Sequence, residues 1–342
     1  MRARLALPLF LLAGVAACDH STPFAAGSYS VGGSRDTGFA VQLTYNPGDD
    51  YGAAWVPDGG SFLYTTQRRD RRDADQCLAT MPAQGGAITS EFCNGSPAAD
   101  DSTNAFFAPA VSATERLAYV RTSSPYLLGA ISPRYQELVV APLAHPDQAT
   151  VLKSLPYLGP SGRPHDTLDY LYWLSDTSLV YLGERLDYPG SCSSCAPDTV
   201  RTGLEIVRLD VGGTSPVLTL LPGTDGATSL AVVPPDTVYF TVFADSRVYR
   251  LALGSDSLMA THDFGAGRVP QGIQVAGSRL IAMVWDTLSD SLFDVDLPSG
   301  AETPITKMTG WRHPALQPGG RRLVADYVTP DGTTDLWLFQ LP

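Results

Sequence analysis

One short strand–turn–strand pattern returns along this chain, and it constrains the fold more than any other feature. Its clearest copy spans residues 53–64, where two apolar runs flank the turn Pro57-Asp58-Gly59-Gly60. Proline presets φ early in a turn, aspartate accepts hydrogen bonds from the backbone beyond it, and glycine tolerates positive φ. The segment is therefore predicted to form an antiparallel β-hairpin.

Weaker copies of this hairpin follow at residues 109–119, 172–181, 230–240, 273–282 and 314–325. Most of them keep part of the turn or a flanking aromatic residue. The positions that define the motif are Trp55, Pro57, Asp58, Gly59, Trp173, Asp176, Asp236, Gly319 and Gly320. Recurrence of one small unit along a chain indicates a repeat architecture, so we expect six units.

Composition favours strands and turns over helices. Hydrophobic residues make up 44% of the chain, which also has 32 Gly and 27 Pro and no long helix-period stretch after its first twenty residues. These features indicate an all-β protein. The formal net charge of −12 argues against nucleic acid as a partner, because phosphates are bound by basic residues. We expect a monomer.

The N-terminus has the order of charges and apolar residues that is typical of an export signal. Arg2 and Arg4 precede an apolar run at residues 5–13, and small residues lead to Cys18. A run this short is a signal peptide and not a membrane span. The motif resembles a bacterial lipobox, which implies lipidation of Cys18 and removal of residues 1–17. The alternative is an ordinary signal peptide with an incidental cysteine.

The segment after the cysteine differs in composition from the repeats. Residues 18–38 are rich in Ser, Gly and Ala, which predicts a flexible tether. We therefore expect a lipoprotein of the bacterial cell envelope, held at the inner or the outer membrane, with residues 39–342 outside the cytoplasm.

Four more cysteines fit an oxidising compartment. Cys77 and Cys93 flank a candidate hairpin, and a disulfide closing a loop of about fifteen residues contributes roughly 3 kcal/mol in the chain-entropy model. Cys192 and Cys195 form a CxxC in a predicted loop. We interpret this pair as a disulfide that staples the loop, because a redox motif would open a helix and a zinc site would need a second ligand pair.

The two ends of the repeat region complement each other. Residues 40–44 are predicted to form a strand without a neighbouring partner, while the sixth unit ends at residues 335–341, one strand short. A ring can be closed when one blade takes strands from both ends of the chain. The expected fold is a six-bladed β-propeller of four-stranded antiparallel blades, in which Val41 lies beside Leu338.

The clearest hairpin also carries a family resemblance. Residues 55–64 resemble the repeat of TolB-like propellers, whose typical unit reads Trp-Ser-Pro-Asp-Gly before an apolar strand. Val56 stands where the family usually has serine. The resemblance does not extend to the separate α/β domain of TolB, since only a short tether precedes the first strand. It implies an interaction module of the cell envelope.

Motifs that carry catalysis are missing from the sequence. The chain has no Gly-x-Ser-x-Gly elbow, no His-Glu-x-x-His and no P-loop. We assign the histidines to the tether and to loops, and we interpret His165-Asp166 as a surface pair; the histidines are His20, His145, His165, His262 and His313. No cofactor is expected, although the acidic residues leave a divalent cation in a central channel open.

The function predicted from these observations is recognition without catalysis. A propeller presents two loop-built faces and a channel, and we expect an envelope protein or peptide as the partner. The tryptophans are interpreted as packing between blades and not as a platform for a sugar. The alternative is a propeller hydrolase or lyase for a sugar or lactone, which three or more carboxylate or imidazole groups converging in the channel would favour.

Overall fold

The computed structural model describes most of the repeat region and is built of strands. The described residues are 40–45, 48–67, 76–93, 102–127, 130–131, 135–156, 169–187, 200–213, 215–286, 290–306, 310–329 and 332–341. Cys18, Cys192, Cys195 and His165-Asp166 lie outside these ranges, as do the signal peptide and the whole tether. No helix in the described ranges is long and apolar enough to cross a membrane.

Four sheets each contain four antiparallel strands. The first consists of β11 (Asp169–Ser175), β12 (Ser178–Asp187), β13 (Val200–Asp210) and β14 (Val217–Leu220). The second consists of β15 (Ala227–Val233), β16 (Thr237–Val242), β17 (Arg247–Ala252) and β18 (Ser257–Asp263). The third consists of β19 (Val269–Ala276), β20 (Arg279–Trp285), β21 (Asp290–Asp296) and β22 (Ala301–Pro304).

The fourth sheet joins the two ends of the chain. It consists of β23 (Trp311–Leu316), β24 (Arg322–Val328), β25 (Thr334–Gln340) and β1 (Ala40–Gln42). Val41 lies opposite Leu338 in the antiparallel pairing of β1 with β25, and the backbone N–H of Leu43 extends this pairing to the carbonyl oxygen of Leu336 at 2.7 Å. The predicted closure of the ring by the N-terminal strand is therefore confirmed.

The remaining strands form one sheet of nine. They are β2 (Asp50–Trp55), β3 (Ser61–Gln67), β4 (Gln76–Pro82), β5 (Ser90–Phe92), β6 (Ser102–Val111), β7 (Arg116–Leu127), β8 (Ala130–Ile131), β9 (Tyr135–Pro142) and β10 (Thr150–Pro156). A single parallel bridge, Gln76 with Ala105, links β4 to β6. Four sheets thus stand as separate blades, and the expected count of six requires dividing the nine-stranded sheet at this bridge.

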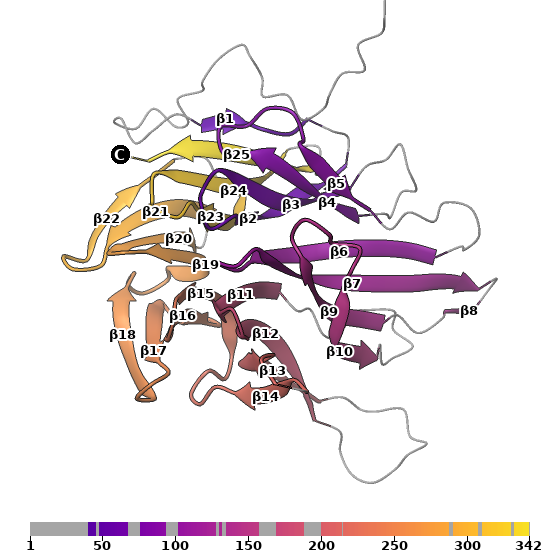
Figure 1. The fold of residues 1–342 in the computed structure, drawn as a ribbon. Coiled ribbons are helices and arrows are strands. Elements are labelled where there is room, and N and C mark those ends of the chain that lie inside the picture. The colour runs from indigo at the N-terminus through magenta and orange to yellow at the C-terminus, as the bar shows by residue number, and fades with distance from the viewer. Residues whose placement is uncertain are drawn as a thin grey trace, which may run out of the picture.

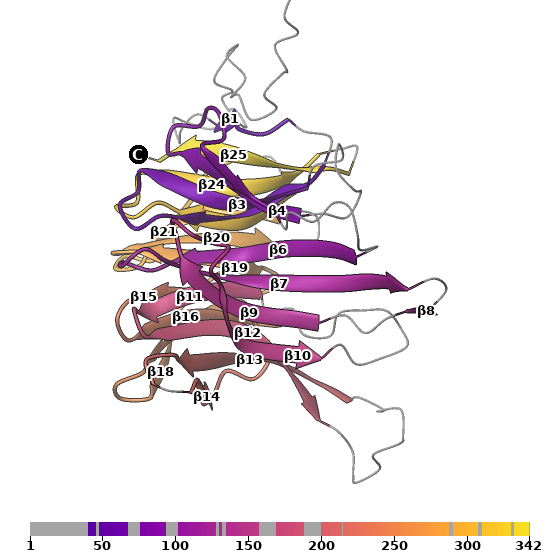
Figure 2. The same cartoon turned by 45° about the vertical axis from the view of Figure 1, so that its right-hand side comes forward.

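The sheets are arranged around a centre, as in a propeller. In Figure 1, β22, β18, β14 and β1 lie at the periphery, while β19, β15 and β11 lie toward the middle. Figure 2 shows β7 reaching beyond the ends of its neighbours β6 and β9. The predicted all-β propeller with four-stranded antiparallel blades is confirmed.

Apolar side chains on facing sheets form the core. One cluster joins Ile281 and Leu292 of one sheet to Trp311, Leu323 and Phe339 of the next, all of them buried. Similar clusters lie between the other neighbouring sheets, and one more lies within the nine-stranded sheet, between β3–β4 and β6–β9. Because alternate side chains of a strand point to opposite faces, each sheet contributes to the clusters on both of its sides.

The tryptophans of the motif hold neighbouring units together. Trp55 and Trp173 are both buried. The indole N–H of Trp55 donates to the carbonyl oxygen of Ala315 at 2.9 Å, and that of Trp173 donates to Ala110 at 3.2 Å. Each bond runs from an inner strand to the inner strand of the adjacent unit, so the rings pack between units in the way that the sequence predicted.

Several turn residues contact an adjacent unit through hydrogen bonds. The carbonyl oxygen of Gly59 accepts from Gln317 at 2.8 Å, and that of Gly320 accepts from Arg279 at 2.6 Å. Asp176 accepts from Thr114 at 2.9 Å. Three turn positions act within their own hairpins: Asp58 accepts from Gly60 N–H, Asp236 accepts from Thr237, and Gly319 has a φ of +94°.

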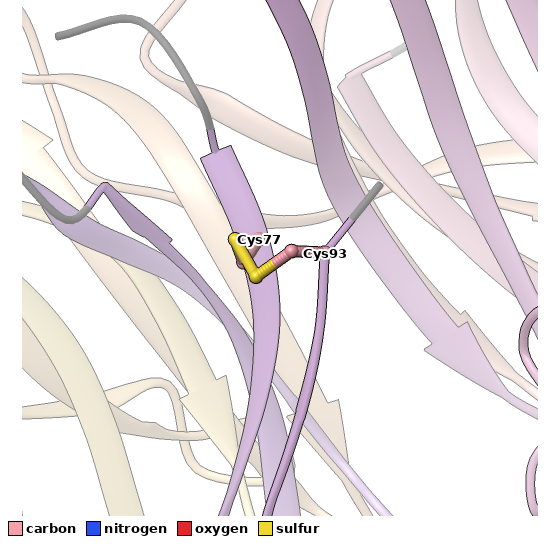
Figure 3. The surroundings of a disulfide bond; sticks show 2 residues. All are labelled: Cys77 and Cys93. Carbon is pink, nitrogen blue, oxygen red and sulfur yellow. A yellow bond between two sulfur atoms is a disulfide. The ribbon is translucent and has the colours of Figure 1, made fainter. Parts of the chain in front are cut away.

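A disulfide fastens one hairpin at the edge of the nine-stranded sheet. Cys77 on β4 is bonded to Cys93, just beyond β5, with the two Cα atoms 4.6 Å apart (Figure 3). The pair closes the hairpin that the sequence placed between these cysteines.

Candidate functional site

A cavity of about 640 Å³ lies at the centre of the ring. Residues from β2, β6, β11, β15, β19 and β23 line it. These are the first strands of the hairpins, so the repeats place one strand each around a common space. A volume of this size suits a small-molecule ligand.

Each of these six inner strands contains a register irregularity. In β23, for example, Arg312 pairs with Asp326 and Ala315 with Val324, so His313 and Pro314 oppose one residue. In four of the strands a residue at this point has a positive φ: Gly52 at 66°, Ala108 at 49°, Tyr170 at 57° and His313 at 39°. Bulges redirect side chains, and positive φ at bulky residues concentrates at functional sites.

His313 forms the best-defined polar contact in the cavity wall. Its Nδ1 lies 2.7 Å from Oδ2 of Asp326 on β24. The carboxylate is completely buried, whereas the histidine side chain is 43% exposed. Both carboxylate oxygens also accept from the backbone N–H of Gly52 at 3.1 Å. Three strands, β2, β23 and β24, therefore fix one imidazole at the cavity.

The charge state of Asp326 follows from these contacts. Burial raises the pKa of its carboxyl above the usual range, and the hydrogen bonds from His313 and Gly52 act in the opposite direction. When the carboxylate is ionised, Nδ1–H of a neutral imidazole donates to it. Nε2 is then the nitrogen that can accept a proton, which is the arrangement of an oriented general base.

Two tyrosines of β11 reach toward β19. The hydroxyl of Tyr170 donates to the carbonyl oxygen of Gln271 at 3.2 Å, and the Tyr170 ring lies 5.9 Å from that of His313. The hydroxyl of Tyr172 accepts from the side-chain amide of Gln274. Burial raises the pKa of Tyr172 to about 12, so this phenol keeps its proton at neutral pH.

Most of the remaining described cavity lining is apolar or aromatic. Trp55, Phe107 and Trp173 belong to it, together with prolines and alanines. Among the described lining residues, Asp176 is the one carboxylate, His313 is the one imidazole, and lysine and arginine do not occur. The convergence of three carboxylate or imidazole groups expected for an enzyme is therefore not met in this part of the chain.

The donor set of the described residues does not fit a bound divalent cation. Metal sites in proteins use three or more ligand atoms held close together. In the described ranges such a group is formed by Cys77, Glu91 and Cys93, and its two cysteines are joined in the disulfide. We therefore derive no chemical step through a metal.

Some of the motif residues singled out in the sequence lie in the cavity wall, whereas the polar groups of the cavity were not predicted. Trp55, Pro57, Trp173 and Asp176 line the cavity, although their contacts hold the fold. The prediction that His262 and His313 lie in loops is wrong, because they belong to β18 and β23. Alignment of the six copies could have pointed to His313 as a cavity residue. It stands three positions before Leu316, as Gly52 stands three positions before Trp55 in the first copy.

Comparison with solved structures identifies the architecture. A gluconolactonase from Xanthomonas campestris has a TM-score of 0.54 at 16% identity, with 89% of this chain and 90% of that chain covered. The fold is that of a β-propeller. TolB from Acinetobacter baumannii gives 0.51 at 13% identity, with coverages of 92% and 79%. An oligogalacturonate lyase in complex with manganese gives 0.50 at 13% identity, with coverages of 92% and 96%.

Sequence comparison adds no family. No protein-family model matches the chain, and no curated protein matches it. At identities of 13–16%, the structural similarity shows the fold alone.

The prediction that this propeller is not an enzyme is contradicted by the comparison. Propellers named as a gluconolactonase and a lyase are among the similar structures. The argument from missing motifs failed because those motifs belong to other folds. In a propeller the channel residues come from separate strands, so their spacing in sequence is not fixed.

Proposed function

We propose that this protein is a propeller enzyme whose channel binds a small sugar or lactone, and that His313 transfers the proton in the reaction. The observation that carries the proposal is the hydrogen bond from His313 to the buried carboxylate of Asp326. A carboxylate in this position sets the tautomer and orientation of an imidazole, as it does in hydrolases on unrelated folds. The similarity to a gluconolactonase and a lyase supports the choice of substrate class.

Hydrolysis of a lactone illustrates the step. Nε2 of His313 takes a proton from water while the water oxygen bonds to the carbonyl carbon. When the ring C–O bond breaks, the imidazolium returns the proton to the leaving alkoxide. One water is consumed, and the product is a hydroxy acid that ionises in solvent. Removal of a proton beside a carbonyl, as in a lyase, uses the same base.

The cell-envelope setting belongs to the same proposal. Cys18 carries the lipid, residues 1–17 are removed, and residues 18–38 connect the lipid to a ring whose nine-stranded sheet counts as two of six blades. Cys192 and Cys195 form a second disulfide. An envelope protein or peptide as a partner remains a prediction of the sequence, and the channel chemistry does not depend on it.

A substrate panel tests the proposal. The protein lacking the signal peptide is incubated with neutral sugar lactones, aliphatic lactones and oligouronides. Acid release at constant pH reports hydrolysis, and ultraviolet absorbance of an unsaturated product reports elimination. We expect turnover of at least one class and a loss of about 10²- to 10⁴-fold in the variant His313→Gln.

His262→Gln is the matched control, because among the described residues His262 is the other histidine that contacts a carboxylate, and it lies outside the cavity lining. Thermal unfolding confirms that each variant is folded. Absence of turnover across the panel, or full activity in His313→Gln, contradicts the proposal.

A further inference from the structure

The lining of the channel also bears on which substrate it accepts. We infer that the channel selects an uncharged lactone or ester over an anionic sugar acid, with the hydroxyl of Tyr172 binding the carbonyl oxygen of the ligand. This inference rests on the proposed function and narrows it to one substrate class.

The charge of the cavity lining disfavours an anionic ligand. A carboxylate leaving water for a partly apolar space needs a cation or several hydrogen-bond donors in compensation. Lysine and arginine do not occur among the described lining residues, and Asp176 adds a negative charge. The chain as a whole has a formal net charge of −12. Both local and long-range electrostatics therefore disfavour an anionic ligand.

The Tyr172 hydroxyl is held in a geometry that suits donation of a hydrogen bond to the ligand. Tyr172 and Gln274 both line the cavity, and the amide of Gln274 donates to the phenol oxygen. With its oxygen held by this donor, the phenol has its own proton available for an acceptor. A hydroxyl anchored in this way is suited to a carbonyl oxygen on which negative charge develops.

The position of Tyr172 relative to the base supports the assignment. Tyr172 and Tyr170 lie two residues apart on β11, and the ring of Tyr170 lies 5.9 Å from that of His313. A donor from β11 and a base from β23 thus face one cavity. The chemistry also favours release of product, because hydrolysis of a neutral lactone creates a carboxylate that the described lining does not stabilise.

Two phenylalanine variants separate the role of the hydroxyl from that of the ring. Tyr172→Phe removes the hydroxyl bonded to Gln274, and the control Tyr119→Phe, outside the cavity lining, removes a hydroxyl bonded to the backbone carbonyl of Pro146. Each is assayed with a neutral lactone and with a uronic acid derivative of similar size. We expect the wild type to prefer the neutral compound at least tenfold in kcat/KM, Tyr172→Phe to lose about 10²-fold, and Tyr119→Phe to lose less than threefold.

Binding without turnover keeps the inference testable on its own. Calorimetry with a stable neutral lactam, and with the open hydroxy acid as its anionic counterpart, measures selectivity directly. Tighter binding of the lactam that weakens in Tyr172→Phe supports the inference even if no substrate is turned over, in which case the proposed function fails alone. Equal or tighter binding of the anion, or unchanged affinity in a folded Tyr172→Phe, overturns the inference.

Discussion

Within the described ranges, two histidines contact carboxylates, and the two pairs have opposite patterns of burial. In the channel pair, His313 and Asp326, the acid is completely buried and the histidine is 43% exposed. In the rim pair, His262 on β18 and Glu302 on β22, the histidine side chain is 7% exposed and the acid is 22% exposed. The Nε2–Oε1 distance of the rim pair is 3.0 Å.

The surroundings of the rim pair explain the difference in role. Glu302 is also paired with the guanidinium of Arg268 at 2.8 Å, and the ring of His262 packs edge-on against Phe264 at 4.5 Å. The bond joins the outer strands of two neighbouring sheets. An imidazole buried in this way fastens two sheets together, whereas an imidazole held from behind and open to a cavity can exchange protons with a ligand.

The largest expected effect comes from Asp326→Asn. An asparagine amide can donate to Nδ1 of His313, which moves the ring proton to Nε2 and removes the proton acceptor from the cavity. We expect kcat to fall by about 10²-fold or more, with a changed pH profile and with KM little altered. Steady-state kinetics on folded protein measure this. Wild-type kcat and pH profile in the variant would show that the carboxylate does not orient the base.

The disulfide offers a second contrast, because it stabilises the molecule away from the channel. Cys77→Ser with Cys93→Ser frees a hairpin closed over a sequence separation of 16 residues. We expect a loss of about 3 kcal/mol in the free energy of unfolding by the chain-entropy model, with turnover unchanged at a temperature where both proteins are folded. Denaturant unfolding checks this, and a loss of activity in the folded variant would contradict the separation of roles.

Truncation of the rim histidine is expected to act on stability alone. His262→Ala removes the bond to Glu302 and the contact with Phe264, which costs about 1–3 kcal/mol of unfolding free energy. Arg268 retains the glutamate, so no buried charge is left uncompensated. Turnover should stay within twofold of wild type. A variant that unfolds normally but loses activity would place the rim pair in the catalytic pathway.

The smallest expected effect is a change in unfolding free energy on acidification, which distinguishes the buried acid of the channel pair from the acid of the rim pair. The pKa of Asp326 is raised by burial, so the folded state takes up this proton before the unfolded chain does. The ionised carboxylate therefore reduces stability above the raised pKa, and this penalty disappears as the pH falls through that value. Relative to Asp326→Asn, the wild type should gain unfolding free energy on acidification while its turnover declines. A wild type that becomes less stable relative to the variant would contradict the assignment.

The propeller fold and its closure could be predicted from the sequence, but the groups in its channel could not. Trp55 and Trp173 revealed the repeat because packing between units requires a large ring at a fixed place in each hairpin. Val41 could be paired with Leu338 because each end of the chain lacked one strand. These features are set by local pattern, which a single sequence contains.

The channel groups could not be predicted in the same way. The role proposed for His313 depends on a bulge in β23 and on Asp326, which lies 13 residues further along on the neighbouring strand. Tyr172 meets Gln274 across 102 residues. Neither spacing belongs to a known motif. The strands β23 and β24 form one hairpin, whereas β11 and β19 belong to different sheets that only the ring brings together.

Both proposals require that the channel holds its ligand between His313 and Tyr172. A crystal structure of the protein soaked with a stable neutral lactam tests this most directly. We expect density for the lactam inside the ring, with its carbonyl oxygen within hydrogen-bond distance of the Tyr172 hydroxyl and its carbonyl carbon on the side of His313. A lactam bound elsewhere on the molecule, or in the channel with its carbonyl turned away from both residues, would contradict it.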